Sequence, residues 1–367
     1  MKARKTPKDE EKLYVASQWQ LMWRKFKRHK LAIIGATVLI FFYIIAIFCE
    51  FFATQDIYKR TTHIYCPPQR IHFFSKEGFH FRPFVYGIEQ KIDPITWQRR
   101  YAEDKTKKYP LYFFVHGDEY KLWNLFRTNI HFFGVKERSL FLFGTDHLGR
   151  DLFSRNIYAA RISLSIGLVG VAISFILGCI LGGISGFYGG MPDMIIQRMI
   201  EFFMSLPTLP LWMALSAALP SDWSPLKVYF GITVVLSLRG WTGLARVVRG
   251  KLISSREEDF IVAAKISGAS DKRIITGHLL PSFLSYLIVS LTLSIPGMIL
   301  GETALSFLGL GIRPPIVSWG VLLKNAQNVE TVALYPWLLI PALFVIVTVL
   351  VFNFLGDGLR DAADPYK

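Results

Sequence analysis

The sequence has few charged residues and few cysteines for its length. Charged side chains make up 19% of the 367 residues, whereas hydrophobic ones make up 52%. That balance excludes an ordinary soluble globular protein, in which charged groups approach about a quarter of the chain. No disulfide framework is indicated, because Cys49 and Cys179 lie in apolar runs and Cys66 stands alone outside them.

Residues for enzymatic chemistry are also scarce. The eight histidines follow no metal-ligand spacing, and no Ser/His/Asp set is evident. Gly250 and Lys251 look like the end of a phosphate-binding loop, but Leu252 replaces the Ser or Thr that would hold Mg²⁺. The leading glycine of such a loop is missing as well, since Ala245 stands in its place. We therefore expect no catalytic residue, no metal site and no cofactor on this chain.

Long apolar runs are what the sequence does contain. They cover residues 31–53, 161–186, 199–220, 227–245, 282–307 and 335–356. Each approaches or exceeds the roughly 20 residues with which an α-helix crosses a hydrocarbon core. A soluble protein would need to bury several nearly charge-free helices of this length, and the alternating segments of a transmembrane barrel are missing. The sequence predicts an all-α polytopic membrane protein with six transmembrane helices.

The first run follows a basic segment, residues 1–30. This segment holds ten Lys or Arg against three Asp or Glu, a net charge of +7 within a chain total of +15. By the positive-inside rule it lies in the cytoplasm, and six spans return the tail, 358–367, to the same side. Run 31–53 is too long for the apolar core of a signal peptide, so we interpret it as a retained first helix.

One face of the basic segment is apolar. Its members are Val15, Trp19, Met22, Trp23 and Phe26. Cations on the opposite face are typical of an interfacial helix that lies on anionic headgroups. Nucleic-acid binding is the alternative explanation of the positive charge, but these cations flank a membrane helix. We therefore expect the lipid bilayer, and no nucleic acid, as a partner.

Residues 54–156 then lie outside the cytoplasmic membrane. This segment is also net positive, which does not oppose the orientation, because loops this long translocate largely regardless of charge. It is dense in aromatic residues and punctuated by prolines, and runs such as 111–115 and 141–143 predict short strands between turns. We expect a β-leaning extracytoplasmic domain of roughly a hundred residues between helices 1 and 2.

A polar stretch at about 246–281 separates two apolar runs and contains the sequence EDFIVAAKISGASDKRIITGHLLP. In it Ala263 and Ala264 are followed by Gly268, and Leu280 and Pro281 directly precede the next apolar run. A linker between membrane helices has no packing reason to be a glycine-punctuated helical surface, whereas a docking surface for a soluble partner has one. The stretch resembles the EAA loop of binding-protein-dependent ABC importer permeases, whose short helix inserts into a cleft of the cytoplasmic ATPase. It departs from that loop at the name-giving Glu, which is replaced by valine here.

Four further motifs extend the resemblance. Residues 144–165 read GTDHLGRDLFSRNIYAARISLS and are similar to the GTD, GRD, SR and AR signature of dipeptide and oligopeptide permease subunits. Residues 187–201, 302–320 and 353–365 resemble the second turn, the fifth-helix exit and the closing motif of that subfamily. The five motifs occur in the family order and cover most of residues 142–367.

The resemblance implies a type I transmembrane domain at 157–357 and a role as one half of the pathway of an ATP-driven importer for short peptides. It implies a second homologous permease, two cytoplasmic ATPases that bind ATP and Mg²⁺, and an extracytoplasmic solute-binding protein. The same subfamily also carries oligosaccharides, opines and nickel complexes, so these substrates stay open. A secondary transporter would show inverted repeats and embedded ionisable residues, and a membrane receptor would leave the docking loop without a reason. The location that follows is the inner membrane, with both termini in the cytoplasm.

Other candidate residues lie at the outer end and within the membrane helices. Alternating charges at Asp146, Arg150, Asp151, Arg155 and Arg161 could form a network that fixes the outer domain, or could help to seat the binding protein. Pathway or hinge candidates are Pro296, Gly297 and Glu302, the last of which could instead anchor the exit turn by accepting backbone hydrogen bonds. A small-residue stripe permits close helix packing, at Gly178, Gly182 and Gly186.

Overall fold

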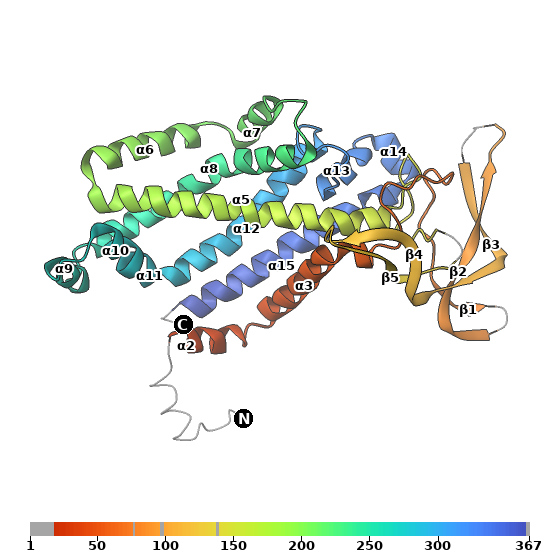
Figure 1. Ribbon diagram of the computed structural model, residues 1–367, viewed down its shortest axis with the longest axis horizontal. Coiled ribbons are helices and arrows are strands. Elements are labelled where there is room, and N and C mark those ends of the chain that lie inside the picture. The colour runs from red at the N-terminus through yellow and green to blue at the C-terminus, as the bar shows by residue number, and fades with distance from the viewer. Residues whose placement is uncertain (1–17, 76–77, 96–98, 137–138, 365–367) are drawn as a thin grey trace, which may run out of the picture.

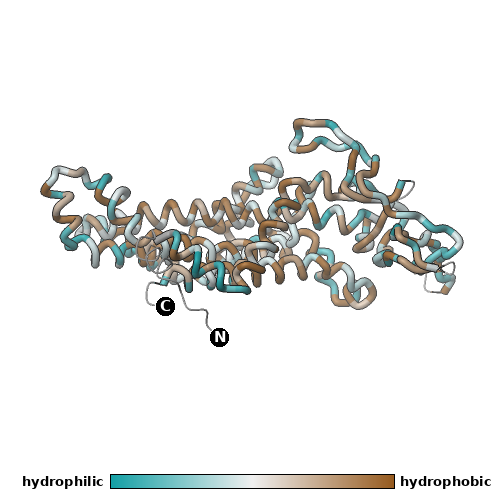
Figure 2. The backbone as a smooth tube through the Cα atoms, turned by 90° about the horizontal axis from the view of Figure 1, so that it is seen from below, coloured by the Kyte–Doolittle hydropathy of each residue, from teal (hydrophilic) through white to brown (hydrophobic). Residues whose placement is uncertain are grey.

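A computed structural model describes residues 18–75, 78–95, 99–136 and 139–364. Long helices lie side by side in an elongated bundle, with all the described strands at one end and α9 and α10 at the other (Figure 1). The long or membrane-associated helices are α2 (Gln18–Phe26), α3 (Lys30–Ile47), α5 (Leu152–Tyr188), α6 (Gly190–Ser205), α7 (Thr208–Ala217), α8 (Pro225–Ser255), α12 (Leu284–Phe307) and α15 (Ile340–Ala363). Figure 2 shows that hydrophobic residues dominate the middle of the bundle, while hydrophilic ones gather near its two ends.

Among the residues that the structure describes, five helices are long and apolar enough to cross a membrane, or up to six if α6 and α7 together form one span. That pair is bent by 92°, and Pro207 begins the break because it cannot continue the hydrogen bonding of a helix. The third span expected at 199–220 is therefore not one continuous helix. The chain is a helical polytopic membrane protein.

Other helix boundaries also differ from the expected ones. α3 ends at Ile47 and is followed by the short α4 (Cys49–Phe52), so run 31–53 is not one continuous helix. α5 begins at Leu152 because the Asp151 side chain caps it, which places the expected boundary at 156–157 inside a helix. α15 continues to Ala363, through most of the segment expected as a tail. Residue 15, placed on the amphipathic face of the N-terminal segment, lies outside the described residues.

The five strands found among the described residues lie between α4 and α5. β1 (His72–Ser75), β2 (Gly78–Ile92) and β3 (Arg99–Pro110) form an antiparallel sheet in that order, while β4 (Tyr112–Leu122) and β5 (Phe126–Gly134) form a separate hairpin. Their shared core is small and is centred on Val85, Leu111 and Leu140. The sheet β1–β3 projects away from the helices, whereas the hairpin lies beside the end of the bundle (Figure 1).

Close packing of α5 against α8 forms the centre of the bundle. A Cβ atom on Gly182 would lie 2.5 Å from the backbone oxygen of Ala245, and one on Gly186 would lie 2.7 Å from that of Arg249. The small-residue stripe of α5 thus faces α8, where only glycine lets the two backbones approach so closely.

Short helices complete the two ends of the bundle. At the end opposite the strands lie α9 (Asp259–Ile266), α10 (Asp271–Ile274), a π-helical turn (Ile275–Leu279) and α11 (Leu280–Ser282). Near the strands lie α13 (Trp319–Leu323) and α14 (Val329–Leu334), with short 3-10 turns at Lys324–Ala326 and Pro336–Leu339. Both described chain ends lie on the α9 side, since the Lys25 ammonium donates to the Asp364 carbonyl at 2.7 Å.

Candidate functional site

Helix α9 rests on the ends of the membrane helices through one face only. Ile261 is fully buried in a cluster with Ile274 and Leu279, and Ala264 packs against the same cluster. Other parts of its surface are open: Phe260 and Ile266 are exposed, the latter at 83% of its surface. An isolated helix of eight residues is marginal in water, so the buried face holds α9 in place and leaves its apolar outer face free.

Gly268 ends α9 for a conformational reason. Its φ of +77° lies in the left-handed region, which residues with a Cβ rarely adopt. The Ala269 N–H donates to the Ala264 carbonyl at 3.0 Å and the Gly268 N–H to that of Lys265 at 3.0 Å, the two bonds of a Schellman cap. No heavy atom lies within 4 Å of a Cβ placed on Gly268. Gly268 is predicted from the sequence as part of the docking surface, but the turn at the end of α9 by itself requires a glycine here.

The other residues predicted for the loop lie along the same surface. Ala263 is exposed on α9, and Pro281 is exposed on α11 while Leu280 is half-buried beneath it. The Lys265 ammonium lies 5.4 Å from the centre of the Phe187 ring, at the end of α5. The first part of the stretch predicted as a loop, from 246 to 255, is instead the last turns of α8.

The predicted outer charges fall into three separate units. In the first, the buried Asp146 carboxylate binds two cations, with Arg150 Nη2 at 2.7 Å and Arg155 Nη1 at 3.1 Å. The same carboxylate accepts the backbone N–H groups of Leu148 and Arg150 at 2.8 and 3.0 Å. Such full satisfaction is what a buried charge needs to be stable.

This unit belongs to a group of contacts that joins the strand-bearing segment to the helices. The Tyr65 N–H donates to the Asp146 carbonyl at 3.1 Å, and the indole N–H of Trp337 donates to the carbonyl of Thr145 at 3.2 Å. A Cβ on Gly149 would lie 2.2 Å from the Thr61 carbonyl oxygen, and the φ of Gly149 is +69°. The signature at 144–151 therefore joins three distant parts of the chain.

Asp151 forms the second unit and pairs with no cation among the described residues. Its carboxylate accepts the backbone N–H groups of Ser154 at 2.7 Å and Phe153 at 3.4 Å, which makes it the N-cap of α5. Burial raises the pKa of Asp151 to about 6, although these hydrogen bonds favour its ionised form.

Arg161 forms the third unit, where α5 meets the end of α3. Its guanidinium binds the Glu50 carboxylate with Nη1 at 2.5 Å and Nη2 at 2.6 Å. It also donates to the carbonyls of Ala46 at 2.8 Å and Ile47 at 2.7 Å, which have no helical partner at the end of α3. Glu50 lies 111 residues away in sequence, so no local pattern points to this pair.

Glu302 is fully buried and is surrounded by serines. Its carboxylate accepts the hydroxyls of Ser306 at 2.7 Å, Ser318 at 2.6 Å and Ser163 at 3.4 Å. Each serine oxygen in turn accepts one backbone N–H, from Ile312, Val321 and Trp319 respectively. The carboxylate thus anchors the turn between α12 and α13 through hydroxyls, and not through direct backbone bonds.

Of the two residues Pro296 and Gly297, which lie apart from Glu302, only Gly297 lines an open cavity of about 360 Å³. Pro296 is buried, while Gly297 faces the cavity and has no atom within 4 Å of an added Cβ. Polar residues share the lining: Ser174, Thr208, Arg239, Ser290 and Ser294.

Arg239 was missed as a candidate from the sequence. It lies near the middle of α8, and its Nη1 donates to the Leu206 carbonyl at 2.8 Å and to the Thr208 hydroxyl, at the break between α6 and α7. The sequence does contain a signal for it, because Arg239 lies inside an apolar run. Burying a cation in a membrane helix costs free energy, so such a residue indicates a function or a backbone partner.

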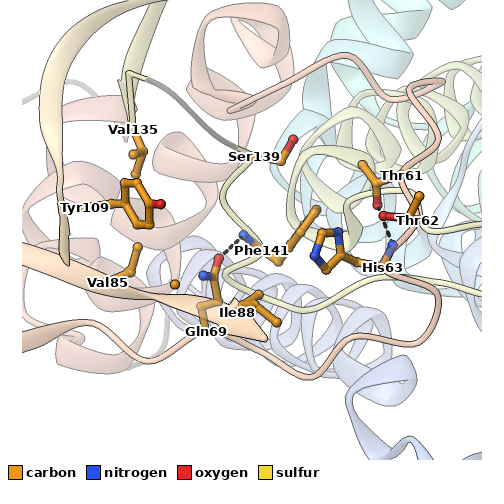
Figure 3. Close-up of a pocket in the computed structure, with 11 residues that line it drawn as sticks. Thr61, Thr62, His63, Gln69, Val85, Ile88, Tyr109, Val135, Ser139 and Phe141 are labelled. Carbon is orange, nitrogen blue, oxygen red and sulfur yellow. Dashed lines mark hydrogen bonds between the residues drawn. The ribbon is translucent and has the colours of Figure 1, made fainter. Parts of the chain in front are cut away.

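A second cavity, of about 420 Å³, lies beside the sheet β1–β3 (Figure 3). Gln69 is committed there to backbone partners: its Oε1 accepts the Phe141 N–H at 2.8 Å and its Nε2 donates to the Tyr86 carbonyl at 3.2 Å. Among the residues that the structure describes, no group of three or more His, Cys, Asp or Glu could hold a metal ion.

Long apolar helices, the close contact of α5 with α8 and a short helix with exposed apolar residues at one end define a polytopic membrane protein. Residues 174–366 match the model of the family "Binding-protein-dependent transport system inner membrane component", and residues 17–68 match "N-terminal TM domain of oligopeptide transport permease C". The chain belongs to the binding-protein-dependent transport system inner membrane components, which are permease subunits of transporters.

Curated relatives agree with the family. The dipeptide transport system permease protein DppC of Lactococcus lactis is 32% identical over 354 residues, which cover 95% of this chain and 91% of the relative. DppC of Bacillus subtilis is 42% identical over 225 residues, or 61% of this chain and 68% of the relative. An inward-facing structure of the MetNI methionine ABC transporter matches 57% of this chain at 16% identity, with a TM-score of 0.44.

Proposed function

We propose that this chain forms one transmembrane half of an ATP-driven importer for short peptides. A second, homologous permease completes the pathway, and a solute-binding protein delivers the peptide from outside. Two cytoplasmic ATPases bind ATP and Mg²⁺ and drive the change between inward-open and outward-open states. The names of the dipeptide and oligopeptide permeases among the relatives support the peptide substrate.

The observation that carries the proposal is the free apolar face of α9. Phe260 and Ile266 are exposed at the tip of the bundle, although the chain has already buried Ile261 on the other face of the same short helix. Exposed apolar residues gathered at one end of a rigid element mark a protein contact. The cleft of an ATPase is the partner that the loop spacing favours.

The same assignment orients the molecule in the inner membrane. With α9 in the cytoplasm, α2 and the end of α15 lie there too, as the charge of the N-terminal segment requires. The strand-bearing segment then forms an extracytoplasmic domain above the outer end of the bundle.

The translocation pathway is proposed to follow the cavity beside Gly297. Its polar lining includes Arg239 and several hydroxyls at the depth of the membrane helices, which suits the peptide groups of a substrate. Pro296 is the hinge candidate in α12, while Glu302 is assigned to anchoring because no part of it is exposed.

The substrate could instead be an oligosaccharide, an opine or a nickel complex, because the binding protein sets much of the specificity. Competition of unlabelled dipeptides against uptake of a labelled dipeptide decides between them. A secondary transporter would take up substrate without the ATPases, and a receptor would take up none, so the same assay with and without the ATPases separates all three classes.

An exposed charge on α9 tests the docking role. We expect Ile266→Asp to abolish copurification of the ATPases and to lower uptake at least tenfold, while the amount of permease in the membrane stays unchanged. Val329→Asp is the matched control, because Val329 is 82% exposed at the opposite end of the bundle. Normal ATPase binding by the Ile266 variant would overturn the proposal.

The end of α9 supplies a second arm of the same test. Gly268→Asn keeps a residue that tolerates the left-handed conformation, whereas Gly268→Val does not. Loss of coupling only in the valine variant would assign the glycine to the Schellman cap. Equal loss in both would mean that the partner contacts the surface at Gly268 itself.

A further inference from the structure

The turn of the β4–β5 hairpin carries a group of exposed apolar residues that the transport function leaves unexplained. The strands pair up to Leu122 and Phe126, and the residues between them form a tight turn. Trp123 and Asn124 have φ values of +52° and +60°, so the turn has a defined shape. At its end Leu125 and Phe126 are 73% and 62% exposed.

Two contacts fix the direction of this hairpin. Near its middle the imidazole Nδ1 of the buried His131 lies 2.6 Å from the Ala53 carbonyl oxygen. At its turn the indole N–H of Trp123 donates to the Ile47 carbonyl at 2.8 Å, and the Trp123 ring lies 5.2 Å from that of Phe48. Ile47 is the last residue of a candidate membrane span and Ala53 lies beyond it, so the turn points back toward the membrane.

The depth of the turn follows from the same contact. Ile47 ends α3, whose outward surface toward the bilayer includes the exposed Ile40, Phe41 and Ile44. The apolar residues of the turn therefore continue the lipid-facing surface of α3. Tryptophan is typical of such a position, because its apolar ring and polar N–H suit the boundary between headgroups and acyl chains.

Charges on the neighbouring residues fit the same depth. Lys121 and Arg127 are paired across the two strands, one step before the apolar turn, and both are exposed. Cations just above an inserted apolar tip meet anionic headgroups.

We propose that the β4–β5 turn is a membrane anchor that inserts Trp123, Leu125 and Phe126 into the outer leaflet. The proposal rests on the orientation given under Proposed function and adds a lipid contact to it. The anchor holds the strand-bearing segment down at α3, so that segment is attached to the bilayer as well as to the helices.

A depth measurement on the assembled transporter in vesicles of phosphatidylglycerol and phosphatidylcholine tests the anchor. A spin label is placed at Leu125→Cys after replacement of Cys49, Cys66 and Cys179 by serine. Phe81→Cys is the matched control, because Phe81 is a 94% exposed aromatic residue on β2, in the sheet that projects away from the helices. We expect the label at residue 125 to collide with oxygen at least threefold more than with a water-soluble nickel chelate, and the label at residue 81 to show the opposite ratio.

Equal access of the nickel chelate to both labels would overturn the anchor. Protection of residue 125 that arises only when the binding protein is added would also overturn it, and would make the turn a protein contact. The readout requires neither ATP hydrolysis nor uptake, so a failure of the anchor and a failure of the transport proposal are separate results.

Discussion

At the scale of single residues, buried polar groups hold the strand-bearing end of this permease together. Glu302 and its three serines convert one carboxylate into support for three backbone N–H groups. The Asp146 carboxylate binds two arginines, and the Arg161 guanidinium donates to the carbonyls at the end of α3. These groups lie where α12, α5 and α3 end, and helix ends are where unpaired backbone groups accumulate.

Loss of the Glu302 carboxylate should weaken the protein without changing its affinity for substrate. We expect Glu302→Ala to lower the free energy of unfolding by roughly 2–4 kcal/mol, because three buried hydroxyls lose their acceptor. Glu302→Gln keeps one acceptor oxygen and should cost about 1 kcal/mol. Thermal unfolding of the purified transporter measures both, and uptake by the surviving Gln variant should keep its KM. A tenfold change in that KM would instead place the carboxylate in the pathway.

How far these residues could be predicted depends on the distance to their partners. The sequence picks out Asp146, Arg150 and Arg155 because they lie close together, and they do form one unit. It cannot pair Arg161 with Glu50, because that contact exists only once α3 and α5 are side by side. Arg239 was within reach, since its position in an apolar run is visible without a fold.

At the scale of elements, the close contact of α5 with α8 can be tested by substitution. Gly182→Ala should lower the free energy of unfolding by about 1–3 kcal/mol, because the added methyl meets the backbone of Ala245 and cannot be avoided by a side-chain rotation. Gly250→Ala on α8 is the control: no atom lies within 4 Å of its Cβ, and the change should be neutral or should stabilise by up to about 1 kcal/mol.

Thermal unfolding in the same detergent compares the two alanine variants. Equal stability would mean that α5 and α8 do not pack as closely as the described contacts require. The comparison is sensitive because the two substitutions add the same methyl group to the same residue type.

The elements also show what hydropathy can and cannot predict. Long apolar runs locate α3, α5, α8, α12 and α15, because lipid requires uninterrupted hydrogen-bonded helices of known length. Hydropathy does not report the direction of the chain. The sequence therefore predicts one span where the structure has two helices, α6 and α7, that are bent by 92° at Pro207. The observed helix ends differ from the predicted ones for a similar reason. A capping residue, Asp151, decides where α5 begins, and apolarity does not.

At the scale of the whole molecule, every assignment depends on which end faces the cytoplasm. Ile266 and Val329 are 83% and 82% exposed at opposite ends of the bundle. Each is replaced by a single cysteine, Ile266→Cys or Val329→Cys, in a protein without its native cysteines. An impermeant maleimide applied to spheroplasts of cells that lack the ATPases should label the second and spare the first, and both should react after lysis. Labelling at residue 266 from outside would invert the protein and remove α9 from any ATPase.

Helix α5 is longer than the membrane is thick. Its 37 residues span about 55 Å, against a hydrocarbon core of about 30 Å. One end is attached to the strand-bearing segment through the contacts around Asp146, and the other lies beside Lys265 of α9. The helix is thus a lever arm between the two sides of the membrane: each degree of tilt at the α9 end displaces the far end by about 1 Å, given that length. In the proposed orientation, a small rotation imposed on α5 in the cytoplasm would therefore move the strand-bearing segment on the other side of the membrane.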